Sequence, residues 1–149
     1  MSSNIKNLDR WAAISAQNIV DGVSDADKME TWITKALGVL QAQGVYACML
    51  YLYANENDHT QRIRQNLWDL LKYVEQLGYK WKDESGKEIK RPSVNPKDSK
   101  TKTDVLNFYA NAVATNIDIL LLVRQLYEQT LIYARYHAKA AQKTGGQSA

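Results

Sequence analysis

The helix-patterned sequence of this chain runs from about residue 5 to residue 143 and is interrupted by one polar stretch, residues 79–103. That stretch carries eight basic and four acidic side chains, a net charge of +4, whereas the formal net charge of all 149 residues is only +3. The rest of the chain therefore sums to −1. A nearly neutral helical body with one basic loop is typical of a module that packs against partners and contacts an anion at a few places; it suits a self-contained enzyme poorly.

Length and composition predict a single helical domain, residues 1–149, with 45% apolar residues to fill one core. Cys48 is the only cysteine, which excludes an intramolecular disulfide, and its apolar neighbours predict a buried thiol. The N-terminal residues lack the apolar run of a signal peptide, and no apolar stretch reaches the ~18 residues of a membrane span. We therefore expect a cytoplasmic protein with no membrane partner.

Hydrophobic periodicity predicts an all-α fold, a compact bundle of five or six helices. The expected helices cover, to within a few residues, 5–20, 25–43, 45–54, 59–77, 104–114 and 116–142. Capping patterns place helix starts at Ser24, Asp58 and Thr115, and Gly44 is expected to close the second helix with a positive φ angle. Residues 45–54 are apolar all round, which favours a short central helix over the alternative of a buried strand.

Two segments are expected to lie outside regular helices. Within residues 79–103, the alternation of charge and size predicts at most a short β-hairpin, with Tyr79, Trp81 and Ile89 on one side. Two prolines then interrupt regular structure before the next helix. The tail, residues 144–149, is expected to be disordered.

The final helix carries a polar stripe. At about 100° per residue, its members fall within roughly 60° of one another. They are Arg124, Glu128, Arg135, Lys139 and Gln142. Arg135 and Lys139 lie four residues apart and repel mildly unless an anion lies between them. The stripe is therefore either an anion-binding surface or a solvated face on which Arg124 pairs with Glu128.

Catalytic and metal-binding patterns are missing from the sequence. Neither His59 nor His137 follows a glutamate by three residues, as a di-metal helical bundle requires. One cysteine and two histidines supply too few of the usual zinc ligands. Nothing matches a nucleophile elbow, a phosphate loop or a dinucleotide fingerprint. We expect no enzyme activity, no cofactor and no metal.

Three separated segments resemble a known family. They are LDRWAAISAQNIV near the start, WITKALGVLQAQGVYACMLYLYA in the middle and LIYARYHAKA near the end. In order and spacing they resemble the small helical subunit of type III-B CRISPR effector complexes, the Cmr small subunit family. The matching positions are Arg10 and Ala12; Gln43, Gly44, Leu50 and Leu52; and Arg135, Tyr136, Ala138 and Lys139. Before the second helix, where family members commonly carry basic and aromatic residues, this chain has SDADKME.

The resemblance implies a non-catalytic small subunit of a type III CRISPR RNA-guided interference complex. Several copies would stack as a minor filament, and the implied partners are the backbone and large subunits, copies of itself, and guide RNA and target RNA contacted through their backbones. The candidate nucleic-acid-binding residues are Arg10, Lys35, Arg135 and Lys139, with Arg62 and the basic loop as secondary candidates.

Two other functions stay open from the residues alone. One is a helical adaptor that binds only proteins, in which the charged loop serves solubility or docking. The other is an enzyme whose site follows no recognised pattern, although the chain lacks a convergent set of titratable residues.

Overall fold

The structure is a computed structural model that describes the backbone of residues 2–148 and the side chains of residues 7–142. Its helices, in chain order, are α1 (Ser2–Val20), α2 (Ala26–Gln43), α3 (Val45–Ala54), α4 (Asp58–Asp69), α5 (Leu71–Gln76), the 3₁₀ turn η1 (Ser99–Thr101), α6 (Lys102–Phe108), the π-helical turn η2 (Tyr109–Val113) and α7 (Ile117–Ser148). No β-strand forms within residues 2–148, so the predicted all-α class is confirmed.

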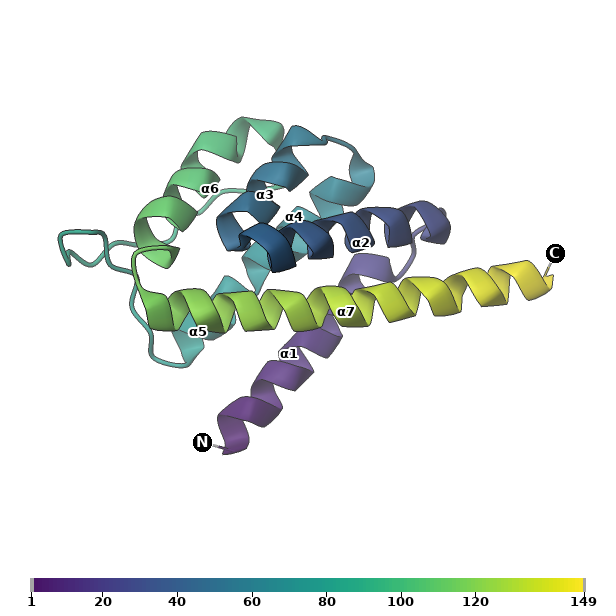
Figure 1. The fold of residues 1–149 in the computed structure, drawn as a ribbon, viewed down its shortest axis with the longest axis horizontal. Helices are drawn as coiled ribbons and strands as arrows, with labels where there is room; N and C mark the ends of the chain where they lie inside the picture. The colour runs from purple at the N-terminus through teal and green to yellow at the C-terminus, as the bar shows by residue number, and fades with distance from the viewer. Residues whose placement is uncertain (1, 149) are drawn as a thin grey trace.

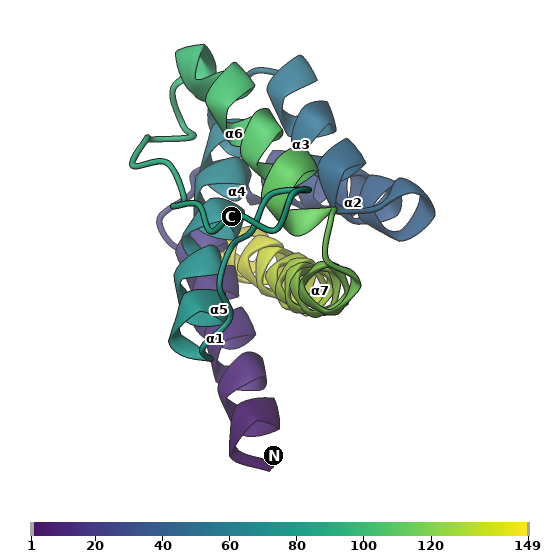
Figure 2. The same cartoon turned by 90° about the vertical axis from the view of Figure 1, so that its left-hand side faces the viewer.

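The long helix α7 is the axis of the fold, and α1 and α2 pack along it more extensively than any other element (Figures 1 and 2). Hydrogen bonds mark two sides of α7. Arg124 donates to the carbonyl of Gln41 over 2.8 Å, and Gln142 donates to the carbonyl of Ala26 over 3.4 Å, so α2 runs antiparallel beside it. On the other side, the Tyr133 hydroxyl donates to Asp9 of α1.

Aromatic side chains join α4, η2 and α7 in the core. The Trp68 ring contacts Phe108 and Tyr109 edge to face, with centroids 5.5 and 5.7 Å apart. The Tyr109 hydroxyl lies 2.6 Å from that of Tyr127, and both side chains are buried. Burial raises the pKa of both phenols, so the pair is neutral and exchanges one hydrogen bond.

The turn between α2 and α3 depends on Gly44, whose φ of 98° confirms the predicted positive angle. Its ψ of −173° is extended, so the residue lies in a region that essentially only glycine occupies and not in the left-handed helical well. The turn brings Cys48 against α2, where its thiol lies 3.6 Å from the Ala36 carbonyl. The thiol is buried, as predicted, and burial raises its pKa to about 12.

The helix starts differ from the predicted caps by one residue. Asp25, not Ser24, precedes α2, and it makes no side-chain capping bond. Asn57, not Asp58, caps α4: its side chain accepts from the Thr60 amide, and the Thr60 hydroxyl accepts from the Asn57 amide, which completes a capping box. Asn116 caps α7, because its short amide reaches two first-turn amides.

Two predicted helices are divided. The segment expected to be one helix over 59–77 tightens at Leu70, whose amide bonds to Leu67 three residues back, and α5 starts anew. The segment 104–114 begins as α6 and widens into η2, where the Ala114 amide bonds to the Tyr109 carbonyl five residues back. The apolar helix α3 lies inside the fold on one side but leaves Tyr46 and Leu50 exposed.

The loop also departs from expectation, whereas the disorder expected for residues 144–149 stays a prediction. Instead of a hairpin, the loop forms a single isolated bridge between Lys82 and Glu88, next to the buried Trp81. Only Trp81 and Ile89 turn inward; Tyr79 is exposed. The bounds of α7 extend to Ser148, and residue 149 lies outside the described residues.

Candidate nucleic-acid and partner interface

The basic loop, residues 79–103, is attached to the helical body by a buried tryptophan. Trp81 is 4% exposed and packs edge to face on Phe108, with ring centroids 5.0 Å apart. Its indole N–H donates to Glu75 of α5 over 2.6 Å. Arg91, from the returning arm of the loop, donates to the same carboxylate over 3.0 and 3.2 Å. One carboxylate therefore holds both arms of the loop.

Glu75 is held ionised by these donors. Burial alone would raise its pKa, but the hydrogen bonds from Arg91 and Trp81 outweigh burial and lower the pKa below its ordinary value. The Arg91 guanidinium is neutralised by this pair and also lies over the Trp68 ring, 5.5 Å from its centroid. Arg91 thus belongs to the structure of the loop and not to its exposed charge.

A second attachment is made by Arg64 of α4, whose side chain has no exposed surface. Its guanidinium donates to both oxygens of Glu56, each over 3.0 Å, and to the carbonyl of Leu52 over 3.2 Å. It also donates to the carbonyls of Pro96, and of Lys97 over 3.0 Å, in the loop. All five N–H groups of Arg64 are used, which fixes the C-terminal arm of the loop against α3 and α4.

The acidic residues of the loop shape its turns. Asp83 accepts from the Ser85 hydroxyl and from the amides of Ser85 and Lys87, and these bonds lower its pKa. Asp98 accepts from the Lys100 amide at the start of η1. Each carboxylate therefore folds the backbone locally, a common role for aspartate in turns.

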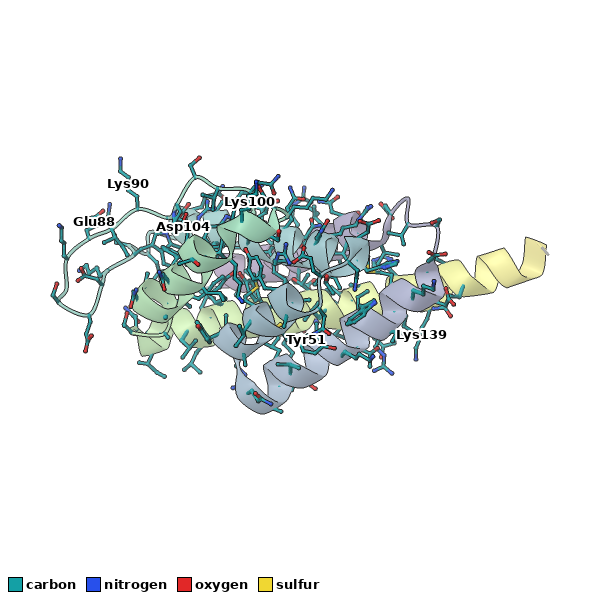
Figure 3. All side chains as sticks on the ribbon, turned by 90° about the horizontal axis from the view of Figure 1, so that it is seen from above. Tyr51, Glu88, Lys90, Lys100, Asp104 and Lys139 are labelled. Atoms are coloured by element: carbon teal, nitrogen blue, oxygen red, sulfur yellow. The ribbon has the colours of Figure 1, made fainter. Side chains whose placement is uncertain are left out.

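Unlike Asp83 and Asp98, which bond to the loop backbone, the lysines of the loop extend into solvent. Six are exposed, and their ammonium groups form no hydrogen bond or ion pair with any residue whose side chain the structure describes. They are Lys82, Lys87, Lys90, Lys97, Lys100 and Lys102. Figure 3 shows Lys90 and Lys100 along the same long edge of the molecule. The seventh, Lys80, lies 3.7 Å from Glu88 in an exposed pair, which contributes little to stability.

The five candidate residues named from the sequence do not converge on one surface. Arg62 has a structural task, because its guanidinium donates to the carbonyls of Asn18, over 3.0 Å, and of Asp21 at the end of α1. Lys35 is exposed on α2, with its ammonium 5.0 Å from the centroid of the Trp32 ring. The Trp32 ring in turn faces Tyr51, so Lys35 lies toward α3 and not toward α7.

Arg10 and the α7 pair also lie apart. Arg10 is exposed on the side of α1 opposite its buried residues. On α7, Tyr133 marks the side facing α1, and Arg135 is turned by about 160° from it at 100° per residue. Arg135 and Lys139 are both exposed and share one stripe. They are the only two of the five candidates that the described structure brings together.

The α7 stripe changes in character along its length. Arg124 does not pair with Glu128 but donates to the Gln41 carbonyl. At about 3.6 residues per turn, Ile117 and Leu121 lie about five turns before Arg135 and Lys139, on the same face. Ile117 is 64% and Leu121 57% exposed. The stripe is apolar at its N-terminal end and basic toward its C-terminal end.

The apolar end of the stripe borders a groove of about 390 Å³. The groove lies where the α2–α3 turn meets η2 and the first turns of α7, and its lining includes Gly44, Tyr46, Val113, Ile117 and Leu121. Leu50, four residues after Tyr46 on α3, is a further exposed apolar side chain outside the groove. The sequence did not predict this groove, because it joins segments more than fifty residues apart, a separation of roughly the size of a small domain.

Among residues 7–142, no group of three or more histidine, cysteine, aspartate and glutamate side chains lies close enough to hold a metal ion. His137 is exposed and His59 half-buried. None of the described helices combines the length and the apolar character that crossing a bilayer requires.

Comparison of the chain with family models, with curated proteins and with solved structures finds no match.

Proposed function

We propose that this chain is a non-catalytic small subunit of a type III CRISPR RNA-guided complex, present in several copies beside the backbone and large subunits. Each copy would pack on protein neighbours and contact guide RNA and target RNA through their backbones. The proposal joins the sequence resemblance to one observation, the two-part stripe on α7.

The stripe supports a subunit with two kinds of neighbour. Its first part, Ile117 and Leu121, leaves large apolar side chains in water next to a groove, an arrangement that marks protein-interaction surfaces. Its second part, Arg135 and Lys139, presents two exposed cations four residues apart. A rigid helix holds the two parts in line, so a copy docked through the groove would present its cations at a fixed position.

Repetition would make such weak cationic contacts sufficient. A single copy with two to four phosphate contacts binds RNA poorly at physiological salt, because each contact is screened and competes with condensed counterions. Copies held in a row convert later contacts into intramolecular ones, which raises overall avidity without new contacts. Contact with phosphates fits a complex in which base pairing already reads the sequence.

The test is to express the protein with its neighbouring effector subunits and to purify the complex. The proposal requires that the chain co-purifies with those subunits and with RNA. Replacing Arg135 and Lys139 together by alanine should weaken retention of target RNA and flatten its salt dependence, with no change in the melting temperature of the isolated subunit. Lys72→Ala, which removes an exposed lysine from α5, is the control and should retain RNA.

The second candidate function is a helical adaptor that binds only proteins, and the apolar groove favours it as well. Leu121→Asp places a charge on the exposed apolar surface and should release the chain from its protein partners under either function. Retention of RNA by the complex distinguishes the CRISPR subunit from the adaptor. A complex that assembles normally and holds RNA with the same salt slope in the Arg135→Ala/Lys139→Ala variant would leave the adaptor as the function.

A further inference from the structure

The basic loop is a second surface that the α7 stripe does not explain. We propose that the loop, residues 79–103, is a preformed binding site for a single-stranded nucleic acid, in which Tyr79 stacks on a base and the exposed lysines contact phosphates. The proposal rests on the proposed function only where it takes RNA to be the natural ligand; the site itself lies on other elements.

Several bonds to the helical body fix the shape of the loop. Trp81 is inserted in the core, Glu75 binds both arms, and Arg64 bonds two loop carbonyls. A further bond joins the two arms at the root of the loop, where the Ile89 amide donates to the Trp81 carbonyl over 2.9 Å. Binding to a segment that is already ordered avoids the entropy cost that a flexible basic tail would incur.

The arginine and the lysines of the loop have different roles. Arg91 is used inside the structure, whereas the six exposed lysines extend into solvent. Lysine is a compact point charge on a flexible stem, which adapts to phosphates at varied positions. Several exposed lysines on a fixed backbone therefore suit an extended polyanion better than one small anion held in a rigid fork.

An aromatic ring lies among these charges. A groove of about 390 Å³ at the root of the loop is lined by Tyr79, Trp81, Ile89, Lys80 and Lys90, together with Glu75, Glu88 and Arg91. Tyr79 is 40% exposed, whereas Trp81 is buried. Both carboxylates of the groove have basic partners, Glu75 in Arg91 and Glu88 in Lys80. Neither carboxylate of the groove pairs with Lys90, so its ammonium group can contact a phosphate.

An exposed ring next to lysines selects among polyanions. Bases stack on such rings when they are unstacked from their own helix, as in a single strand. A duplex offers only its backbone and would gain nothing from Tyr79. An acidic peptide would likewise use the lysines but not the ring. The geometry therefore favours a single strand.

The experiment measures binding of the full chain to labelled oligonucleotides of about 12 nucleotides by fluorescence anisotropy. RNA, DNA of the same sequence and a matched duplex are each titrated between about 50 and 200 mM salt. Lys90→Gln/Lys100→Gln should reduce the slope of log affinity against log salt by about 1.4, since each single-strand phosphate contact contributes about 0.7. Lys28→Gln/Lys72→Gln removes the same charge elsewhere and should leave the slope near that of the wild type.

Tyr79 gives an independent readout. Tyr79→Ala should weaken single-strand binding by roughly tenfold with the salt slope unchanged, and Tyr79→Phe should bind like the wild type. Thermal melts confirm that each variant is folded. Tighter binding of either single strand than of the duplex supports the site, and the ratio of RNA to DNA affinity identifies its preferred sugar.

Three results would overturn the proposal: equal slopes in the loop and control variants, no loss of affinity in Tyr79→Ala, or competition by polyglutamate as effective as that by RNA. The outcomes separate from those of the proposed function. Loop variants that bind like the wild type, beside a complex that loses RNA on changing α7, would remove the loop site alone. A complex that never contains RNA, beside an isolated chain that binds single strands through the loop, would remove the proposed function alone.

Discussion

Arg64 offers the sharpest test of how the loop is attached, because one side chain joins α4, the end of α3 and two loop carbonyls. Its substitution by alanine removes five donors at once. The carbonyls of Leu52, Pro96 and Lys97 lose their partners, and Glu56 loses both of its hydrogen bonds from the guanidinium. The change also leaves a cavity where a fully buried side chain stood.

The expected cost follows from the burial of each partner. Breaking a buried ion pair by removing one member costs about 3–5 kcal/mol, because the other member is left uncompensated. The Glu56 side chain is 32% exposed, so water can solvate the abandoned carboxylate. That places the value in the lower part of the range. We expect Arg64→Ala to lose about 3 to 4 kcal/mol, or about 6–16 °C in Tm for a chain of this size.

Urea unfolding followed by tryptophan fluorescence measures the loss. Arg10→Ala is the matched control, since Arg10 is exposed, and it should change the free energy of unfolding by less than about 0.5 kcal/mol. Arg64→Lys keeps the charge but cannot reach five acceptors and should recover less than half of the lost stability. A cost below about 1 kcal/mol for Arg64→Ala, or full recovery with lysine, would refute the reasoning.

Three further outcomes follow from the core and the loop. Gly44→Ala should cost about 1–3 kcal/mol, because its φ and ψ suit only glycine while the added Cβ would meet no neighbour; an unchanged urea midpoint would contradict this. Tyr109→Phe should cost about 1–3 kcal/mol by leaving the Tyr127 hydroxyl buried without a partner, and a double-mutant cycle should show that the paired Phe variant costs less than the sum of the single changes. Burial raises the pKa of Glu75, but hydrogen bonds from Arg91 and the Trp81 indole lower it below its ordinary value. The stability that Glu75 contributes is therefore complete above the unfolded pKa of about 4.3 and is lost as the pH falls through the lower native pKa. Acid unfolding should therefore be less pH-dependent in Glu75→Gln than in the wild type, and parallel curves would exclude the role given to this carboxylate.

Much of the helical arrangement could be predicted because it depends on local periodicity. The stretch 45–54 and the glycine before it have signals within a few residues, and both elements lie where the sequence placed them. Helix starts were harder, since Asp, Ser, Thr and Asn compete for the same position. Asn57 caps α4 through a reciprocal bond with Thr60, whereas the sequence favoured the next residue, Asp58, as the cap.

The site was less accessible to prediction, because burial of a charged residue depends on partners far along the chain. Arg64 lies four residues before Trp68 and three before Leu67, so its position on the buried face of α4 was a local signal that could have been used. Its acceptors, the carbonyls of Pro96 and Lys97, lie more than thirty residues away and could not be predicted from the sequence. The same holds for Arg62, whose partners at the end of α1 lie more than forty residues away in the sequence.

Counting basic residues therefore gives a poor measure of the charge that a partner meets. The arginines Arg62, Arg64, Arg91 and Arg124 all donate to backbone carbonyls or to a carboxylate. Arginine suits these places because its planar fork serves several fixed acceptors, and a lysine there would leave some of them unpaired. Apart from these arginines, the exposed cations among the described side chains lie on the loop, on α1 (Arg10), on α2 (Lys28 and Lys35), on α5 (Lys72) and on α7 (Arg135 and Lys139). These lie on separate elements, so any polyanion that contacts more than one of them must extend across the molecule, which favours a long strand over a small anionic ligand.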